Sequence, residues 1–443
     1  TVKELEYFLA YKGGQSVWKF IAEKYGREKI GEVFQAMKRL RGAEKGFKSA
    51  IGMDYDELTE QWHKYIKKEF YPDVAGRDEV EDIAKKLTDH KKARNVYNVS
   101  PAISPDGGKI AFLTNNLSYF DIDLIDAVTG KKIKKLIKGS RSLDFEELKF
   151  LQPGISWSPD SKKIVFAAKS GSGDALYIVD IESEQKEKIP FELDGVFSAT
   201  WSPQGDKLAF VGYEKGASDI YIYDINKKTH FNLTKDIYSD SEPSWSPDGS
   251  SIAFVSDRDD AEKKSISTAQ DMISVDYESK DIYVINIETE NLKQITSTGY
   301  NEDYPVFANT EKSLFYIADS SGTWNLFKYD LASGSTSVVT NLLTGIFQLS
   351  INKYDDAMVF SGYSNRGWDV YRLNNPLDLS RVDVEPTNFV LNKDFVEKEE
   401  LLDLRKDKWR GSDSNQSDYS RHIFAMEYES YNNQNLQIEK QSA

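Results

Sequence analysis

One short phrase recurs through the middle of this chain and constrains its fold more than any other feature. Its clearest copy runs from Glu242 to Arg258, where Ser246-Pro247-Asp248-Gly249 separates two apolar segments. Proline fixes the first corner of a turn, aspartate binds its own backbone, and glycine takes the corner that a side chain would obstruct. Trp245 before the turn and Ile252 to Phe254 after it have the β preference of paired strands. The phrase therefore predicts a hairpin.

The hairpin is repeated six times along the chain, four times with its proline and twice with only the apolar frame. The equivalent positions are Pro105, Pro159, Pro203, Pro247, Asn309 and Lys353. The basic interval between copies is 44 residues. Repeats of about 40–50 residues that hold four strands are typical of propeller blades, and the strand chemistry argues against helical repeats of similar length. We predict a mainly β fold, with a six-bladed β-propeller over residues 93–375.

Each repeat follows its hairpin with two more strands, such as Asp281 to Asn286 and Leu292 to Thr296. The sixth repeat departs from this pattern, because its third strand ends at Leu373 and Pro376 stands where a fourth strand should begin. A strand pattern without a hairpin partner, Lys92 to Asn98, precedes the first repeat. We expect this segment to complete the sixth blade and close the ring.

Residues 1–72 have the apolar periodicity of α-helices. The apolar faces expected on these helices are Val17 to Tyr25, Ile30 to Leu40 and Leu58 to Phe70. Residues 73–92 are highly charged, and residues 376–443 lose the repeat and contain a polar run typical of loops or disorder. The expected organisation is a small N-terminal helical domain, a linker, the propeller and a partly irregular C-terminal extension.

Composition narrows the classes of function. The 443 residues include no cysteine, which excludes disulfides, thiol catalysis and thiolate metal sites. The net charge of −15 repels phosphate backbones, so we expect no nucleic-acid partner and favour basic proteins or peptides. No run approaches the roughly 20 apolar residues of a membrane helix. Thr1 opens the chain without a leader pattern, so we expect an export signal that is absent or already removed, or a fragment of a longer protein.

Two groups of residues in the helical segment, Tyr11 to Gly26 and Phe47 to Tyr65, resemble the C-terminal helical part of peptidase-MA-like (gluzincin-type) metallohydrolases. Those enzymes hold zinc with an H-E-x-x-H helix, in which two imidazoles share a face and the glutamate activates water. The motif is absent here, and the isolated histidines are His63, His90, His230 and His422. We expect structural or surface roles for them and no metal site. The resemblance also allows a zinc-binding half upstream of Thr1.

The S-P-D-G turn, the Ile252-Ala253-Phe254 core and the Ser256-Asp257-Arg258 step also carry a resemblance. Through them the repeat region is similar to the six-bladed, WD40-like propellers of TolB-type translocation proteins. It is more distantly similar to the propellers of dipeptidyl peptidase IV, prolyl-oligopeptidase relatives and tricorn protease. The TolB resemblance implies a periplasmic or otherwise extracytoplasmic location, and association with the outer membrane through a longer parent or a partner.

Loop lengths indicate a working surface. Strand direction alternates within a blade, so the S-P-D-G turns share one face, and the loops between second and third strands and between blades share the other. This long-loop face carries the excursions over residues 139–154 and 258–280, and long loops on a rigid scaffold are where binding residues concentrate. It is acidic and aromatic, although acidic loops also serve solubility alone. The candidate partner-binding residues are Asp144, Glu146, Tyr238, Asp240, Glu242, Asp257, Arg258, Tyr300, Glu302 and Asp303.

Two other residue series are expected to be structural. The turn aspartates, which should cap backbones, are Asp106, Asp160 and Asp248, and the tryptophans that should pack between blades are Trp157, Trp201 and Trp245. No G-x-S-x-G nucleophile elbow and no G-x-x-x-x-G-K-[ST] phosphate loop occurs, so we expect no catalytic residue and no cofactor.

Two hypotheses follow from these patterns. The first is a non-catalytic, TolB-like scaffold of the bacterial cell envelope that binds a protein or peptide at the acidic long-loop face. The second is the accessory, substrate-gating portion of a larger zinc metallopeptidase whose metal-binding half lies upstream of residue 1. An H-E-x-x-H motif in the upstream sequence would discriminate between them.

Overall fold

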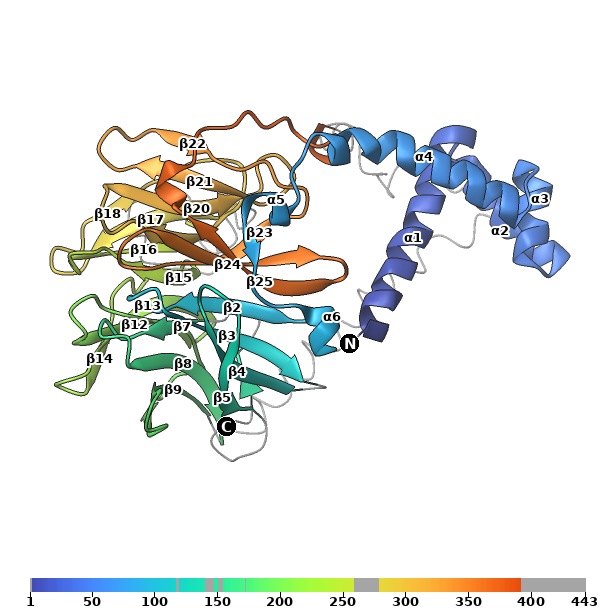
Figure 1. Ribbon diagram of the computed structural model, residues 1–443. Coiled ribbons are helices and arrows are strands. Elements are labelled where there is room, and N and C mark those ends of the chain that lie inside the picture. The colour runs from blue at the N-terminus through green and yellow to red at the C-terminus, as the bar shows by residue number, and fades with distance from the viewer. Residues whose placement is uncertain are drawn as a thin grey trace, which may run out of the picture. The chain divides into compact units, whose positions relative to one another are not determined.

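The computed structural model describes residues 2–116, 119–139, 147–149, 154–171, 173–258 and 279–391 (Figure 1). The chain divides into two compact units, residues 1–390 and 391–443. The irregular extension predicted over residues 376–443 is described only as far as residue 391. Beyond that residue the prediction lies outside the described part of the chain.

Six antiparallel sheets form a six-bladed β-propeller, which confirms the predicted fold class. Blade one consists of β2 (Asn98–Ile103), β3 (Lys109–Asn116), β4 (Tyr119–Asp126) and β5 (Lys132–Lys138). Blade two consists of β6 (Glu147–Leu148), β7 (Ile155–Trp157), β8 (Lys163–Ser170), β9 (Gly173–Asp180) and β10 (Lys186–Pro190). Blade three consists of β11 (Gly195–Trp201), β12 (Lys207–Glu214), β13 (Ala217–Asp224) and β14 (Thr229–Asn232).

The remaining three blades follow the same plan. Blade four consists of β15 (Asp240–Trp245), β16 (Ser251–Ser256), β17 (Asp281–Asn286) and β18 (Leu292–Gln294). Blade five consists of β19 (Glu302–Phe307), β20 (Ser313–Ala318), β21 (Asn325–Asp330) and β22 (Thr336–Val338). Blade six consists of β23 (Ile346–Ile351), β24 (Ala357–Ser364), β25 (Gly367–Asn374) and β1 (Lys85–Lys86). The first strand of every blade is the inner strand, and in blade two β6 and β7 pair with successive parts of β8.

The S-P-D-G turns hold their hairpins through side-chain hydrogen bonds. In blade four, Ser246 Oγ donates to Asp248 Oδ1 at 2.6 Å, and the Ser250 N–H donates to the same oxygen at 3.0 Å. These hydrogen bonds, that from Ser246 first, lower the pKa of Asp248. Asp106 and Asp160 make the same two kinds of contact in blades one and two. The prediction that these aspartates cap backbones is confirmed.

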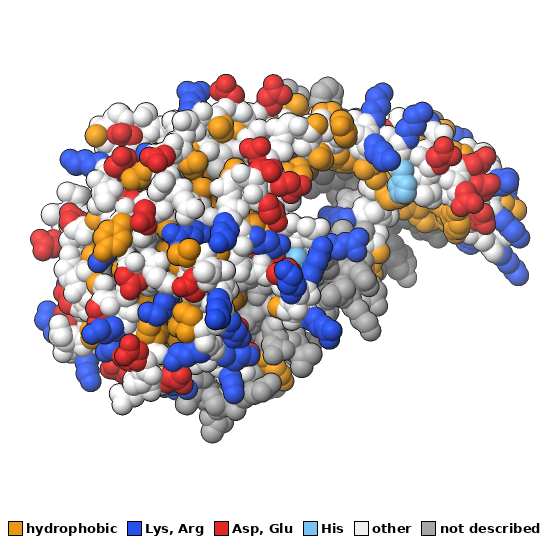
Figure 2. Space-filling model, in the orientation of Figure 1, with side chains coloured by type: hydrophobic (Ala, Val, Ile, Leu, Met, Phe, Trp, Pro, Cys, Tyr) orange, Lys and Arg blue, Asp and Glu red, His pale blue; other side chains and the backbone are white. Residues whose placement is uncertain are grey.

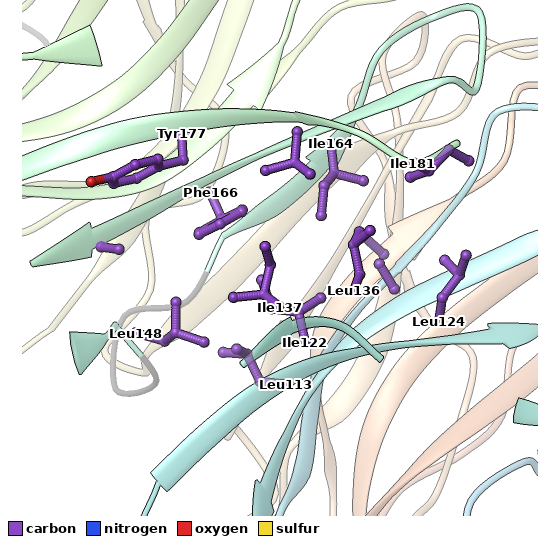
Figure 3. Close-up of a cluster of buried hydrophobic side chains, with 14 of the residues drawn as sticks. Leu113, Ile122, Leu124, Leu136, Ile137, Leu148, Ile164, Phe166, Tyr177 and Ile181 are labelled. Atoms are coloured by element: carbon purple, nitrogen blue, oxygen red, sulfur yellow. The ribbon is translucent and has the colours of Figure 1, made fainter. Parts of the chain in front are cut away.

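Apolar side chains fill the spaces between neighbouring blades. Between blades one and two the buried cluster includes Leu113, Ile164 and Phe166 (Figure 3), and full burial of one such side chain is worth about 1.5–3 kcal/mol. Trp157 packs into this cluster, and its Nε1–H donates to the carbonyl of Ala102 in the preceding blade at 2.8 Å. Trp245 Nε1 likewise donates across blades, at 3.2 Å. The expected packing role of these two tryptophans is confirmed.

The ring is closed by β1, and the prediction that Lys92 to Asn98 would close it was wrong. Lys85 and Lys86 pair with β25, and the Leu87 N–H donates to the carbonyl of Val370 at 2.8 Å. Figure 1 shows this blue segment between α5 and α6 beside the orange-red strands of blade six. Asn98 instead begins β2, the inner strand of blade one, which runs from Asn98 to Ile103 and leads into the first turn. The closing strand thus comes from the range predicted to be a linker.

Asp369 fastens this closing segment to the rest of blade six and to blade one. Its side chain is fully buried. Its carboxylate accepts hydrogen bonds from Thr88 Oγ1 at 2.9 Å and from Asn98 Nδ2 at 3.0 Å, and lies 2.8 Å from Lys86 Nζ. His90 Nδ1 lies 2.6 Å from the same carboxylate. His90 therefore has the structural role expected of it.

Four α-helices make the N-terminal helical region, α1 (Val2–Tyr25), α2 (Glu28–Leu40), α3 (Ala43–Ile51) and α4 (Tyr55–Ala75). Two short helices follow, α5 (Val80–Ile83) and α6 (His90–Ala93), and a 3-10 turn, η1 (Pro376–Asp378), comes after the last blade. The long helices enclose a small core built on Phe20, Ile21, Val33, Phe47 and Leu58. None of the helices described is long and apolar enough to cross a membrane.

Candidate functional site

A cavity of about 380 Å³ lies in the centre of the propeller, enclosed by the six inner strands. Its deepest set of equivalent residues stands five positions before the proline position of each repeat, and consists of Ser100, Gly154, Ser198, Glu242, Tyr304 and Gln348. Its outer end is formed by Pro105, Pro159, Pro203, Pro247, Asn309 and Lys353. The cavity therefore opens toward the face of the S-P-D-G turns. Its volume is typical of a ligand pocket.

A β-bulge in the inner strand positions the deepest residue of the cavity. In β15 the pairing with β16 shifts between Ser241 and Ser244, and the same shift occurs in the inner strands of blades one, three, five and six. Glu242 within this bulge has a φ of 55°, as has Tyr304 in blade five. Such a left-handed backbone costs a residue with a side chain about 1–3 kcal/mol, and bulges of this kind re-aim a side chain.

The longer bulge side chains bind the next blade. Gln348 Oε1 accepts the Ser100 N–H at 2.7 Å, and Glu242 Oε2 accepts the Tyr304 N–H at 2.6 Å. The two contacts are equivalent in the propeller, so one acceptor oxygen is all that this structural role requires. Gln348 fulfils it without charge, whereas Glu242 brings a carboxyl group into the cavity.

Glu242 lies in an environment that opposes ionisation. Burial, followed by the neighbouring charge of Asp303, raises its pKa to about 8 against the attraction of Lys280 and the Tyr304 hydrogen bond. Within the described part of the chain, no Lys or Arg side chain is within ion-pair distance of this carboxyl group. Glu242 is also the one acid among the six deepest positions of the cavity.

The wild-type protein should lose stability as the pH rises from about 4.5 to 8, and replacement of Glu242 by glutamine should reduce that loss. A folded-state pKa near 8, above the usual 4.5, means that the protonated carboxyl stabilises the fold at low pH. That contribution is complete below the unfolded-state pKa and is lost as the pH rises through the folded-state pKa. The melting temperature of Glu242→Gln should therefore increasingly exceed that of the wild type from pH 5 to pH 8.5. Thermal unfolding across this range measures the difference, and parallel profiles would contradict it.

Three of the predicted partner-binding residues form a buried cluster. Tyr238 and Asp240 are 0 % exposed, and Arg258 is 2 % exposed. The Arg258 guanidinium lies 2.6 Å from Asp240 Oδ1 and 3.1 Å from Asp236 Oδ2, and 5.3 Å from the ring centroid of Tyr238. Asp219, Asp236 and Asp240 bring carboxylate oxygens within 4.8 Å of one another, and Arg258 binds two of these groups.

The other predicted residues are placed separately. Asp257 accepts the Ser239 N–H at 2.7 Å, and Glu302, 2 % exposed, accepts the Thr298 hydroxyl at 2.6 Å. Burial is the largest cause of the raised pKa of Asp303. Tyr300 is 45 % exposed. Asp144 and Glu146 lie outside the described residues. Of the eight candidates that the structure describes, only Glu242 lines the cavity.

Sequence reasoning missed the other residues of the cavity because it searched the long-loop face. Their signal was present, since each deep position stands at a fixed distance before the turn. Those positions hold serine, glycine, serine, glutamate, tyrosine and glutamine, whereas four of the six turns begin with Ser-Pro and all six blades keep an apolar core. Acidic and basic side chains are mixed on the face of the propeller shown in Figure 2.

Comparison with known proteins agrees with this architecture. The family model described as the TolB beta propeller domain matches residues 146–263, which confirms the TolB resemblance for that segment. TolB from Acinetobacter baumannii is 20 % identical, with a TM-score of 0.44, and the alignment covers 61 % of this chain and 65 % of that one. The tricorn protease is 15 % identical, with a TM-score of 0.42 and coverages of 64 % and 30 %. No curated protein matches the chain.

A lyase is also among the similar structures, an oligogalacturonate lyase in complex with manganese, which is 14 % identical with a TM-score of 0.41 and coverages of 66 % and 93 %. Likenesses at this level select no activity. The strand order and the cavity define a six-bladed propeller with a hollow centre, and the match to the TolB-type family model extends over residues 146–263. The resemblance of its helical segment to peptidase-MA-like enzymes stays a prediction.

Proposed function

We propose that this protein is a non-catalytic, extracytoplasmic scaffold that binds a protein or peptide in its central cavity. The supporting observation is the contrast between a nearly repeated frame and an irregular lining. The six deepest positions are equivalent in the repeat, and all but Gly154 share a left-handed backbone, yet the six carry five different residue types. Selection for folding alone would favour one residue type at equivalent positions, whereas recognition of an asymmetric partner requires different ones.

The polar groups described around the cavity support binding rather than catalysis. Ser156 Oγ accepts the Trp201 N–H at 3.0 Å, and Ser350 Oγ accepts the Ile103 N–H at 3.1 Å. These hydroxyls join neighbouring blades, and a serine nucleophile would instead need a base within hydrogen-bond distance. The extracytoplasmic location and any association with the outer membrane rest on the TolB resemblance alone.

Filling the cavity should abolish partner binding without unfolding the propeller. Ser244 lines the cavity and is half-buried, so Ser244→Trp places an indole in the space that the partner would occupy. A photo-cross-linking residue at Pro203, at the cavity mouth, reports the partner in an envelope fraction. We expect one discrete cross-linked product that disappears in Ser244→Trp.

The matched control is Glu187→Trp, which adds the same side chain to an exposed position of β10. It should leave the cross-linked product unchanged, and both variants should keep a cooperative unfolding transition. Persistence of the product in the folded Ser244→Trp protein, or failure of any product to form in the wild type, would contradict the proposed function.

A further inference from the structure

Two charged side chains line the cavity at different depths. Glu242 is one of the six deepest residues, and Lys353 is one of the six that form the mouth. Lys353 has its Nζ 4.8 Å from the ring centroid of Tyr354. The other lining residues are serine, threonine, proline, aromatic, aliphatic and amide side chains. The electrostatic character of the deep end is therefore decided by Glu242.

The backbone hydrogen bond that Glu242 accepts from the next blade does not require a negative charge. The equivalent Gln348 receives the same type of backbone hydrogen bond from the following blade with a neutral side chain. Burying an uncompensated carboxylate disfavours folding, and burial together with Asp303 raises the pKa of Glu242 accordingly. Glu242 thus costs stability, lines a cavity and has a neutral counterpart, Gln348, at the equivalent position of blade six. A group with these properties is a candidate for ligand binding.

The surroundings select the chemistry of that ligand. The groups acting on Glu242 are Asp303 and Tyr304 of β19 and Lys280, which precedes β17. Asp303 adds negative charge, and Tyr304 contributes its backbone N–H and a side-chain hydrogen bond, both of which Glu242 already uses. An anion in the cavity would be repelled by Glu242 and by the neighbouring Asp303, whereas an ammonium or guanidinium group would compensate the Glu242 carboxylate.

We propose that the deep end of the cavity binds a lysine or arginine side chain of the partner, with Glu242 as its counter-ion. This inference rests on the proposed function and specifies its ligand chemistry. Binding of a cation requires ionised Glu242, so affinity should increase about tenfold per pH unit toward pH 8 and then level off. Affinity increases with pH because binding of the cation releases the carboxyl proton of Glu242.

Two capped pentapeptides test the inference, acetyl-Gly-Ser-Lys-Ser-Gly-amide and its norleucine analogue. The full chain is titrated with each by NMR at pH 8, and the lysine peptide should bind at least tenfold more tightly. Glu242→Gln should lower the affinity for the lysine peptide to that for the norleucine peptide and remove the pH dependence. Glu311→Gln changes an exposed acid paired with Lys328, and should leave the preference unchanged.

An equal response to the two peptides, including no response to either, would overturn the inference, as would a folded Glu242→Gln protein that keeps the lysine preference. The two proposals fail separately. If Ser244→Trp loses cross-linking but the lysine peptide is not preferred, the cavity is a binding site and the proposed cation ligand is wrong. If the lysine peptide is preferred but Ser244→Trp does not affect cross-linking, the cation site stands and the proposed scaffold role is wrong.

Discussion

Replacement of Asp369 by alanine is expected to lower the free energy of unfolding by about 3–5 kcal/mol, the cost typical of breaking a buried ion pair by removing one partner. The Asp369 carboxylate is fully buried and binds Lys86, Thr88, His90 and Asn98. Alanine would leave these donors without their acceptor and release the closing strand from β25. Urea unfolding followed by tryptophan fluorescence measures the loss.

Asn325, which occupies the equivalent position in blade five, suggests an informative second variant. Its side-chain oxygen accepts the Leu342 N–H at 2.7 Å and the Thr340 hydroxyl at 3.1 Å, without any charge. Asp369→Asn should therefore keep the hydrogen bond that Asp369 Oδ1 accepts from the His90 N–H at 2.8 Å. It should lose mainly the ion pairs, with a destabilisation smaller than that of Asp369→Ala. Asp378→Ala, at an exposed position, is the control. Equal stability of the Asp369→Ala and Asp378→Ala proteins would refute a closing role for Asp369.

The true closing strand could have been found from the sequence. In three blades an aliphatic residue and a threonine directly follow the outer strand, and the threonine Oγ1 accepts the N–H of the residue after the buried Asp or Asn. Val370 N–H and Thr88 make the same contact at 2.9 Å. The corresponding sequence pairs are Leu233-Thr234, Ile295-Thr296, Val339-Thr340 and Leu87-Thr88. The segment predicted to close the ring, Lys92 to Asn98, contains no such pair.

The direction of the acidic side chains could not have been read from the sequence. In a regular strand Asp240 and Glu242, two residues apart, would point to the same face of the sheet. The bulge between Ser241 and Ser244 breaks that alternation. Asp240 consequently joins the buried cluster of Arg258, and Glu242 lines the central cavity. Four hairpins were predictable from turn chemistry and two from the apolar frame, but the bulged positions do not share one residue type that would mark them in the sequence.

Loop length was a poor indicator of the cavity because inner strands and short turns form the lining that the structure describes. The depth of the central cavity is set by inner-strand residues and by the turn residues that end those strands, such as Pro203 and Pro247. Short turns leave this end of the channel uncovered. The long excursions that drew attention to the opposite face lie mostly outside the described residues, so the binding role predicted for that face stays a prediction.

Removal of the guanidinium in Arg258→Met is expected to destabilise the protein by about 3–5 kcal/mol, because buried carboxylates would lose their cation. Arg258 pairs with Asp236 and Asp240, and three aromatic rings surround its guanidinium at centroid distances of 5.1–5.3 Å. Methionine preserves much of the volume, so the loss should report charge rather than a cavity. Equilibrium unfolding in urea at pH 8 measures it.

The pH dependence distinguishes lost charge compensation from lost packing. Burial raises the pKa of Asp240 to about 7, against the attraction of Arg258. Without the guanidinium this pKa should rise further, so the carboxyl would be neutral and less costly at pH 5 than at pH 9. The destabilisation by Arg258→Met should therefore be larger at pH 9.

A second comparison makes the charge argument independent of that profile. Asp236→Asn with Asp240→Asn, introduced together into Arg258→Met, should recover a large part of the lost stability, since the two carboxylates that Arg258 pairs with would then be replaced by neutral amides. A destabilisation that is equal at pH 5 and pH 9 and is not relieved by the two asparagines would show that Arg258 stabilises the blade through packing against Phe254 and Tyr283, and not by neutralising the buried acids.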